Sequence, residues 1–245
     1  MLLPLKDLNP TRTFPFVNYA LIVANVVAYI WETLLIRQNG EAAVVSGYGL
    51  VATRLVGDPT GEFFTVFTSM FMHGGLAHLA GNMLSLYIFG DNVEDALGHR
   101  RYLGFYLLAG VAAAAGQLLT GLGSPVAMVG ASGAIAGVMG AYVVLYPRAP
   151  ILCLLLFVVI TVPAWLMIGL WFALNLSGGL NSLGLGSMGG VAFFAHIGGF
   201  LAGLLLVRPL LAGRARRESS QWAGWRPPPR RAAVSRSRYD AWRDG

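Results

Sequence analysis

The sequence predicts an all-α membrane protein, built as a bundle of six transmembrane helices with a short, recessed fourth helix. Composition and charge distribution carry this prediction. The 245-residue chain is 56% hydrophobic and only 11% charged, whereas a soluble domain has roughly 25% charged residues. No charged residue lies between Arg148 and Arg208, which leaves room for two spans of about 20 residues each. The composition therefore excludes an ordinary soluble fold.

Six apolar segments follow one another along the chain. In lipid each must be helical, because every backbone polar group has to be paired within its own segment. The fourth segment has about 15 residues, or roughly 22 Å of helix, against about 30 Å of hydrocarbon, so it must start below the membrane surface. In chain order the segments are Phe14–Ile36, Leu76–Ala96, Tyr102–Leu122, Ser132–Tyr146, Pro150–Leu176 and Gly190–Leu211.

The basic residues predict the orientation of this bundle. With six spans, both termini and the second and fourth connections share one side, which carries fifteen of the 17 Lys and Arg residues. The positive-inside rule makes this side cytoplasmic. We expect an integral multi-pass protein with both termini in the cytoplasm, in the plasma membrane of a prokaryote. The first loop, residues 37–75, then lies outside and carries apolar stretches too short to span.

The chain divides into a cytoplasmic lead (1–13), a six-span domain (14–211) and a basic cytoplasmic tail (212–245). Residues 208–245 hold ten arginines against three acidic residues and have no apolar period, which predicts a disordered tail. Two interpretations stay open for it: contact with anionic lipid headgroups, or a topology anchor with no other role. Because the net positive charge comes from the tail alone, we expect no nucleic-acid partner.

Polar side chains gather at the predicted outer ends of the second, fourth and sixth segments. Such groups are costly in a membrane and tend to mark function. The three segments enter from the same side, so the polar groups at their starts fall at one depth. Asn82 follows His78 by four residues and therefore shares its helix face. The converging residues are His73, His78, Asn82, Ser132 and His196.

Paired glycines predict close contact between the fourth and sixth segments. Gly133 and Gly137 are four residues apart, as are Gly199 and Gly203. Such small-residue pairs allow helix backbones to approach closely. The approach would bring a serine and a histidine within hydrogen-bond reach, which is the minimum for an activated nucleophile.

Three motifs resemble the rhomboid family of intramembrane serine proteases, and the six-span plan agrees. The resemblance implies an endopeptidase that cleaves transmembrane helices of membrane-protein substrates within the lipid bilayer, near its outer face, with residues 14–211 as a rhomboid-like catalytic domain. It implies Ser132 as nucleophile, His196 as base, His78 and Asn82 as the oxyanion and pocket group, and His73 as the first motif histidine. The motifs lie in Thr68–Arg101, Gly130–Gly137 (GASGAIAG) and Ala195–Gly203 (AHIGGFLAG).

The residues themselves favour a two-residue catalytic mechanism. No Asp or Glu lies in the fourth or sixth segment, so Ser132 and His196 would form a dyad, without a carboxylate as third member. The oxyanion would take hydrogen bonds from the Ser132 backbone N–H, Asn82 and a neighbouring histidine, helped by the dipole of the fourth helix. No cofactor and no metal are expected.

The chain departs from the family pattern at two places. Phe64 and Thr65 stand where the family often has a Trp-Arg pair, and Ala136 stands where an aromatic side chain often packs on the base. Other residues must therefore position His196.

Three other functions stay open. An inactive relative could escort membrane clients, and would bind them without cleaving them. A metal site could use three imidazoles, although no carboxylate or Cys accompanies them. A transporter would explain the polar groups but not the serine.

Overall fold

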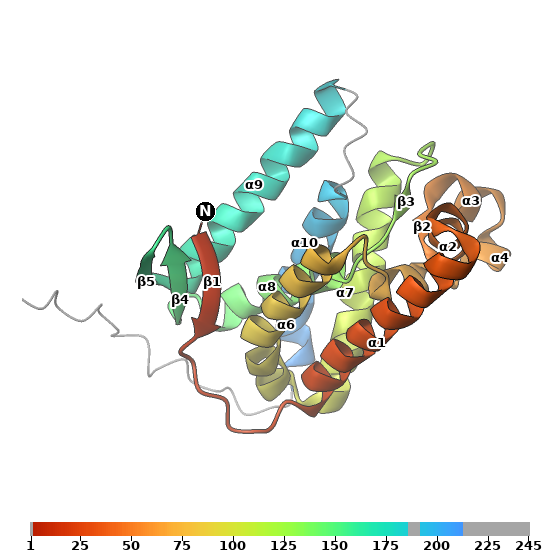
Figure 1. The fold of residues 1–245 in the computed structure, drawn as a ribbon. Coiled ribbons are helices and arrows are strands. Elements are labelled where there is room, and N and C mark those ends of the chain that lie inside the picture. Colours follow the sequence, from red (N-terminus) through yellow and green to blue (C-terminus); the bar gives the residue numbers. More distant parts are fainter. Residues whose placement is uncertain (1, 186–191, 213–245) are drawn as a thin grey trace, which may run out of the picture.

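The computed structural model describes residues 2–185 and 192–212 of the chain. The structure is mostly helical, as expected, and a helix of at least 14 residues overlaps each of the six predicted apolar segments (Figure 1). These long helices are α1 (Phe16–Asn39), α6 (Leu76–Leu97), α7 (His99–Thr120), α8 (Ser132–Leu145), α9 (Ala164–Leu185) and α10 (Phe193–Leu210). The predicted tail lies outside the described residues, except for Ala212.

The structure is not purely helical as predicted, because it also contains two small β-sheets. Strands β1 (Leu2–Asp7), β4 (Pro150–Leu155) and β5 (Val158–Pro163) form an antiparallel sheet in the order β1-β4-β5. Strands β2 (Leu50–Val51) and β3 (Ala127–Met128) form a second antiparallel pair. In Figure 1 the three-stranded sheet lies beside the lower end of α9.

The hairpin of β4 and β5 replaces the first half of the predicted fifth span. A continuous apolar run does not by itself distinguish a strand from a helix. Residues 158–162 are Val-Val-Ile-Thr-Val, and β-branched side chains favour strands. Leu156 turns the chain between the strands with φ of +55°. Helix α9 therefore starts at Ala164 and continues past the predicted end of the span to Leu185.

The predicted lead packs against the helices instead of standing apart from them. Strand β1 pairs with β4, and the buried Asp7 carboxylate accepts hydrogen bonds from Asn92 Nδ2 of α6 at 2.6 Å and from the Tyr142 hydroxyl of α8 at 3.0 Å. Burial, followed by the charge of Asp91, raises the pKa of Asp7 from 3.8 to about 7. Residues on either side of the boundary at position 13 thus share one polar cluster.

The predicted first loop is made largely of short helices. They lie between α1 and α6 in the sequence, and the β2–β3 pair connects this segment to the loop before α8 (Figure 1). The short helices are α2 (Glu41–Tyr48), α3 (Ala52–Gly57), α4 (Pro59–Glu62), α5 (Thr65–Thr68) and η1 (Ser69–Phe71). The apolar stretches that are too short to span a membrane therefore fold onto the bundle.

Helix α8 is the centre of the bundle and packs against α6, α7, α9 and α10. Every residue from Gly133 to Tyr142 is buried. A methyl group built on Gly199 would lie 1.9 Å from the carbonyl oxygen of Gly133, and one on Gly203 would lie 2.0 Å from that of Gly137. The predicted close approach of these two backbones is therefore confirmed.

The outer faces of the long helices are apolar. Three described helices, α1, α7 and α10, are long and apolar enough to cross a membrane, and α8 is a shorter apolar helix. Exposed apolar side chains on the outer faces include Val27, Leu108, Leu174 and Leu205. Exposed apolar surface of this extent is typical of a protein that faces lipid. Six crossings and a recessed α8 stay predictions.

We expect Gly199→Ala to destabilise the protein by roughly 1–3 kcal/mol, because the added methyl group forces α8 and α10 apart in a packed core. Thermal unfolding of the purified protein in detergent measures the effect. Gly104→Ala of α7 is the matched control, since a methyl group there meets nothing within 4 Å and alanine favours a helix. Equal unfolding temperatures for the two variants would contradict the close contact.

The buried Asp7 predicts a pH-dependent stability. Its folded-state pKa of about 7 lies above 3.8, so its contribution is fully present below about pH 4 and is lost as the pH rises to about 7. The difference corresponds to at most roughly 4 kcal/mol. We expect the unfolding temperature of the wild type to fall between pH 4 and pH 8 by more than that of Asp7→Asn, whose side chain stays neutral. Parallel pH profiles for the two proteins would rule out this role.

Candidate active site

Ser132 is the first residue of α8, directly after a turn that contains two small residues. Gly130 has φ of +127°, a conformation that side chains rarely adopt, and its N–H donates to the Ser69 carbonyl at 2.8 Å. The turn therefore places Ser132 at the N-terminal end of a buried helix. The first N–H groups of a helix have no partner inside it and carry partial positive charge.

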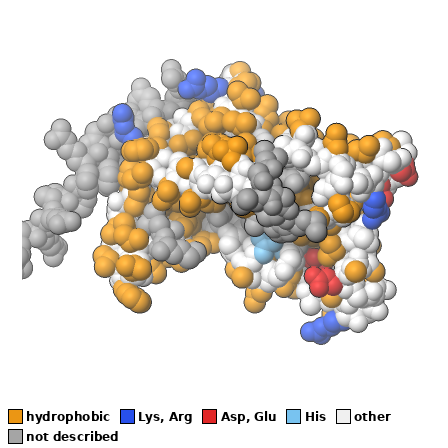
Figure 2. Space-filling model, turned by 90° about the horizontal axis from the view of Figure 1, so that it is seen from above, with side chains coloured by type: hydrophobic (Ala, Val, Ile, Leu, Met, Phe, Trp, Pro, Cys, Tyr) orange, Lys and Arg blue, Asp and Glu red, His pale blue; other side chains and the backbone are white. Residues whose placement is uncertain are grey.

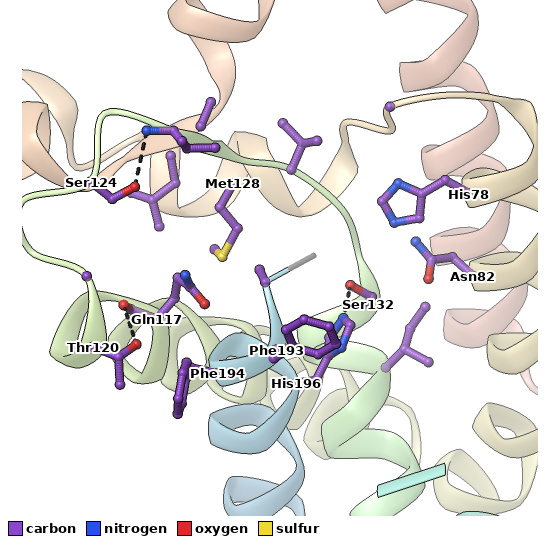
Figure 3. A pocket seen from close by; sticks show the side chains of 18 of the residues that line it. His78, Asn82, Gln117, Thr120, Ser124, Met128, Ser132, Phe193, Phe194 and His196 are labelled. Carbon is purple, nitrogen blue, oxygen red and sulfur yellow. Dashed lines mark hydrogen bonds between the residues drawn. The ribbon is translucent and has the colours of Figure 1, made fainter. Parts of the chain in front are cut away.

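His196 of α10 contacts Ser132 directly. Its Nε2 lies 2.7 Å from the Ser132 Oγ, across 64 residues of sequence. Figure 3 shows this contact beside the cavity. His196 lies one helical turn before Gly199, and Ser132 directly precedes Gly133, so the close glycine contact of α8 and α10 is adjacent to the serine–histidine pair.

The other ring nitrogen of His196 contacts a residue that the sequence reasoning did not identify. Nδ1 lies 2.6 Å from the side-chain oxygen of Asn175 on α9. The Trp171 ring, one turn earlier on the same helix, lies with its centroid 5.7 Å from that of His196. A signal was available, because an amide within a predicted span is a polar group that needs a reason to be there.

His78 and Asn82 of α6 lie on another side of Ser132. A Cβ atom on Gly130 would come within 2.9 Å of the His78 Nε2 and 3.5 Å of the Ser132 Oγ, so the His78 ring packs on the turn before the serine. Asn82 is buried, and its Nδ2 has no hydrogen-bond partner among the described residues. In Figure 3 both side chains face the region of Ser132. Asn82 thus presents a free donor beside the serine.

His73 lies behind His78 and not on the wall of the cavity. It is buried, its ring centroid is 5.2 Å from that of His78, and its Nδ1 lies 3.2 Å from the Phe71 carbonyl oxygen. Its backbone N–H donates to the buried carboxylate of Glu32 on α1 at 2.9 Å. The sequence reasoning also missed Glu32. It could have been noticed as the single acidic residue in the first apolar segment.

A cavity of about 910 Å³ connects Ser132, His196, His78 and Asn82. Its wall comes from α6, α7, α8, α9, α10 and the loop before α8, and combines amide and hydroxyl groups with apolar side chains. Viewed from above, histidine atoms are visible at this face of the molecule, bordered mainly by atoms of the class coloured white (Figure 2). Further lining residues labelled in Figure 3 are Gln117, Thr120, Ser124, Met128, Phe193 and Phe194. The serine therefore opens onto a space large enough for a peptide segment.

The structure shows the surroundings of Ala136, Phe64 and Thr65, the residues that depart from the family pattern. Ala136 is fully buried in α8, and the aromatic ring beside His196 is Trp171 of α9. Thr65 is buried and Phe64 is exposed. The contacts that position His196, which the sequence left open, thus include two side chains of α9 in the structure.

The three-imidazole alternative finds no support in this geometry. His78 neighbours His73, whereas His196 is held by Ser132 and Asn175. Within residues 2–185 and 192–212, no three His, Cys, Asp or Glu side chains lie together in a way that could hold a metal ion.

The chain is similar in sequence to several known proteins of bacteria, plants and yeast. "Rhomboid protease GluP" of Bacillus subtilis is 32% identical over 203 residues, covering 82% of this chain and 36% of that protein. "RHOMBOID-like protein 6, mitochondrial" of Arabidopsis thaliana is 33% identical over 187 residues, covering 73% of this chain and 52% of that protein. "Rhomboid protein 1, mitochondrial" of Saccharomyces cerevisiae is 34% identical over 146 residues, covering 58% of this chain and 40% of that protein. The matches span about half the length of these relatives or less.

A family match covers the same region as the site. Residues 60–213, more than half of the chain, match the Rhomboid domain. This range includes α6 to α10 and the three side chains joined by the contacts of His196, namely Ser132, Asn175 and His196 itself. The chain therefore belongs to the rhomboid family, whose fold is a membrane-embedded helical bundle.

Proposed function

We propose that the chain is an intramembrane serine endopeptidase that cleaves transmembrane helices of membrane-protein substrates near their outer ends. The observation that carries this proposal is the 2.7 Å contact between the Ser132 Oγ and the His196 Nε2. A serine hydroxyl is a weak nucleophile at neutral pH and needs an adjacent base. Membership of the rhomboid family and relatives named as rhomboid proteases support the same activity.

The reaction would proceed in two acyl-transfer steps. The Ser132 Oγ attacks the scissile carbonyl while His196 Nε2 accepts the hydroxyl proton. His196 then returns this proton to the leaving amine, and the acyl-enzyme remains. Water that enters the cavity gives a proton to the same nitrogen and attacks the acyl carbonyl. The bond between the carbonyl carbon and the Ser132 Oγ then breaks, the proton passes from His196 to this oxygen, and the carboxylic acid product leaves. Only groups of this protein and the attacking water take part in this scheme, without a metal or cofactor.

The oxyanion would be stabilised by donors on the opposite side of Ser132 from His196. The buried Asn82 Nδ2 without a partner is the first candidate, because a donor left unpaired in the resting enzyme is free for an oxygen that appears only during reaction. The Ser132 N–H at the start of α8 is the second candidate. His78, packed on the Gly130 turn, is the third.

The cavity favours an unwound peptide segment over an intact helix. Its amide and hydroxyl groups can hydrogen-bond an extended backbone, whereas a helix pairs its own N–H and C=O groups internally. The site forms at the N-terminal ends of α6, α8 and α10, which the positive-inside rule places on the outer side. From the distribution of the basic residues we propose that both termini are cytoplasmic, and we propose a prokaryotic plasma membrane as the location.

The remaining proposals concern the parts of the chain. Residues 14–211 form the catalytic domain, with β1 of the lead packed against it. For the arginine-rich tail two proposals stay open: contact with anionic headgroups on the cytoplasmic side, at about 1 kcal/mol per basic residue near the surface, or a topology anchor with no other role.

We expect Ser132→Ala to abolish cleavage of a membrane substrate in reconstituted vesicles, and His196→Ala to do so almost as fully, because nucleophile and base act as one unit. A fluorophosphonate reagent should label the wild type at Ser132 alone. Thermal unfolding controls for folding of both variants. Cleavage by the alanine variants, or labelling at another residue, would refute the assignment. Substrate binding by a wild type that never cleaves would favour the escort function instead.

We expect Asn82→Ala to lower kcat by roughly 10²-fold, which is typical for the loss of one oxyanion donor, with little change in KM. The variant should remain folded, because Asn82 Nδ2 has no partner to lose among the described residues. Initial rates over a range of substrate concentrations separate kcat from KM. An unchanged kcat would remove Asn82 from the mechanism.

A further inference from the structure

The amide of Asn175 contacts the ring nitrogen of His196 that faces away from Ser132. The two atoms, Asn175 Oδ1 and His196 Nδ1, are 2.6 Å apart and come from different helices, α9 and α10. The Asn175 side chain is 9% exposed. The imidazole is therefore held at both nitrogens, by Ser132 on one side and by Asn175 on the other.

A second hydrogen bond determines which way the Asn175 amide points. Its Nδ2 donates to the Trp171 carbonyl oxygen at 2.8 Å. A carbonyl oxygen only accepts, so the nitrogen of the amide must face Trp171 and the oxygen must face His196. That oxygen also only accepts, so His196 Nδ1 must carry a hydrogen. In a neutral imidazole the remaining nitrogen, Nε2, then has the free lone pair and faces the Ser132 hydroxyl.

Helix α9 holds Asn175 in this place through its own attachment to the bundle. At its start, the Ala164 N–H donates to the Ala149 carbonyl at 2.9 Å, and the Trp165 N–H donates to the Pro147 carbonyl at 2.9 Å. One turn before Asn175, the Trp171 ring packs near both His196 and Phe200 of α10. Residues four apart share a helix face, so Trp171 and Asn175 together form the α9 surface that meets the base.

We propose that Asn175 is a positioning residue for His196, and that its side-chain oxygen keeps the imidazole in the tautomer and orientation that accept the Ser132 proton. This inference rests on the proposed protease function. The site then operates as a serine, a histidine and a neutral amide, and the third member stands where triads often have a carboxylate.

Asn175 neither gains nor loses a proton during the proposed reaction. When Ser132 attacks, its hydroxyl proton moves to His196 Nε2, and the ring becomes an imidazolium. The Nδ1 hydrogen stays on the ring and donates to the Asn175 oxygen, a hydrogen bond that becomes charge-assisted and hence stronger in this state. The Nε2 proton then passes to the leaving amine. Asn175 therefore stabilises the imidazolium without touching the substrate.

Two substitutions of similar size separate the acceptor role from packing. Asn175→Leu keeps the volume and loses the acceptor. Asn175→Asp keeps an oxygen toward His196 but, when ionised, loses the donor toward Trp171. Leu174→Ala on the outward face of α9, where the side chain is 65% exposed, is the matched control. For each folded protein in vesicles we would measure kcat and KM with a membrane substrate, and the rate of Ser132 labelling by a fluorophosphonate.

We expect Asn175→Leu to lower kcat and the labelling rate by roughly 10²-fold, the scale of one general-base contribution, with KM within about twofold of the wild type. Asn175→Asp should stay within about tenfold of the wild type. Leu174→Ala should match the wild type. If Asn175→Leu does not fold, Asn175→Ala takes its place in the comparison with Asn175→Asp.

Two results would overturn the inference while the proposed function stands. The first is wild-type kcat in Asn175→Leu. The second is an equal loss in Asn175→Leu and Asn175→Asp, which would make the amide donor to Trp171, and hence packing, the important feature. In both cases Ser132→Ala would still abolish cleavage. A wild type that neither cleaves nor becomes labelled would instead overturn the protease function, and this inference with it.

Discussion

The close approach of α8 and α10 is the constraint on which the site depends. The carbonyl oxygens of Gly133 and Gly137 lie where methyl groups on Gly199 and Gly203 would be. Without a hydrophobic driving force between helices in lipid, van der Waals contact of this kind holds them together. Ser132 directly precedes the first of these contacts and His196 lies one turn before its partner. Any side chain in the seam would therefore lengthen the 2.7 Å contact between serine and histidine.

The attachment of α9 to the bundle is a second constraint, and it acts on the position of His196. The β4–β5 hairpin leads into α9, and backbone hydrogen bonds from Ala164 and Trp165 tie its first turn to the segment after α8. Further along, Trp171 and Asn175 reach His196. The small sheet, which Figure 1 shows at the start of α9, is thus part of the framework that orients α9 towards His196.

Two buried carboxylates elsewhere in the bundle accept hydrogen bonds from backbone N–H groups. Glu94 of α6 is fully buried and accepts hydrogen bonds from the N–H groups of Val17 and Asn18 at the start of α1. Glu32 of α1 accepts the N–H of His73, which lies in the loop before α6. An acceptor at a helix start satisfies donors that the helix itself leaves unpaired. The unpaired Nδ2 of Asn82, directly beside the serine, differs from these structural carboxylates in having no partner among the described residues.

The sequence by itself determined the helical character of the chain, the starts of α6 and α8, and the glycine contact of α8 with α10. These features depend on local composition, because lipid selects apolar helices and small residues select close packing. The β4–β5 hairpin could not be predicted, since an apolar run has no period that separates strand from helix when both of its faces are covered. Only the tertiary structure decided the partners of His196. Its contacts with Asn175 and Ser132 join residues 21 and 64 positions apart, and such distances are set by how three helices pack, which no local pattern records.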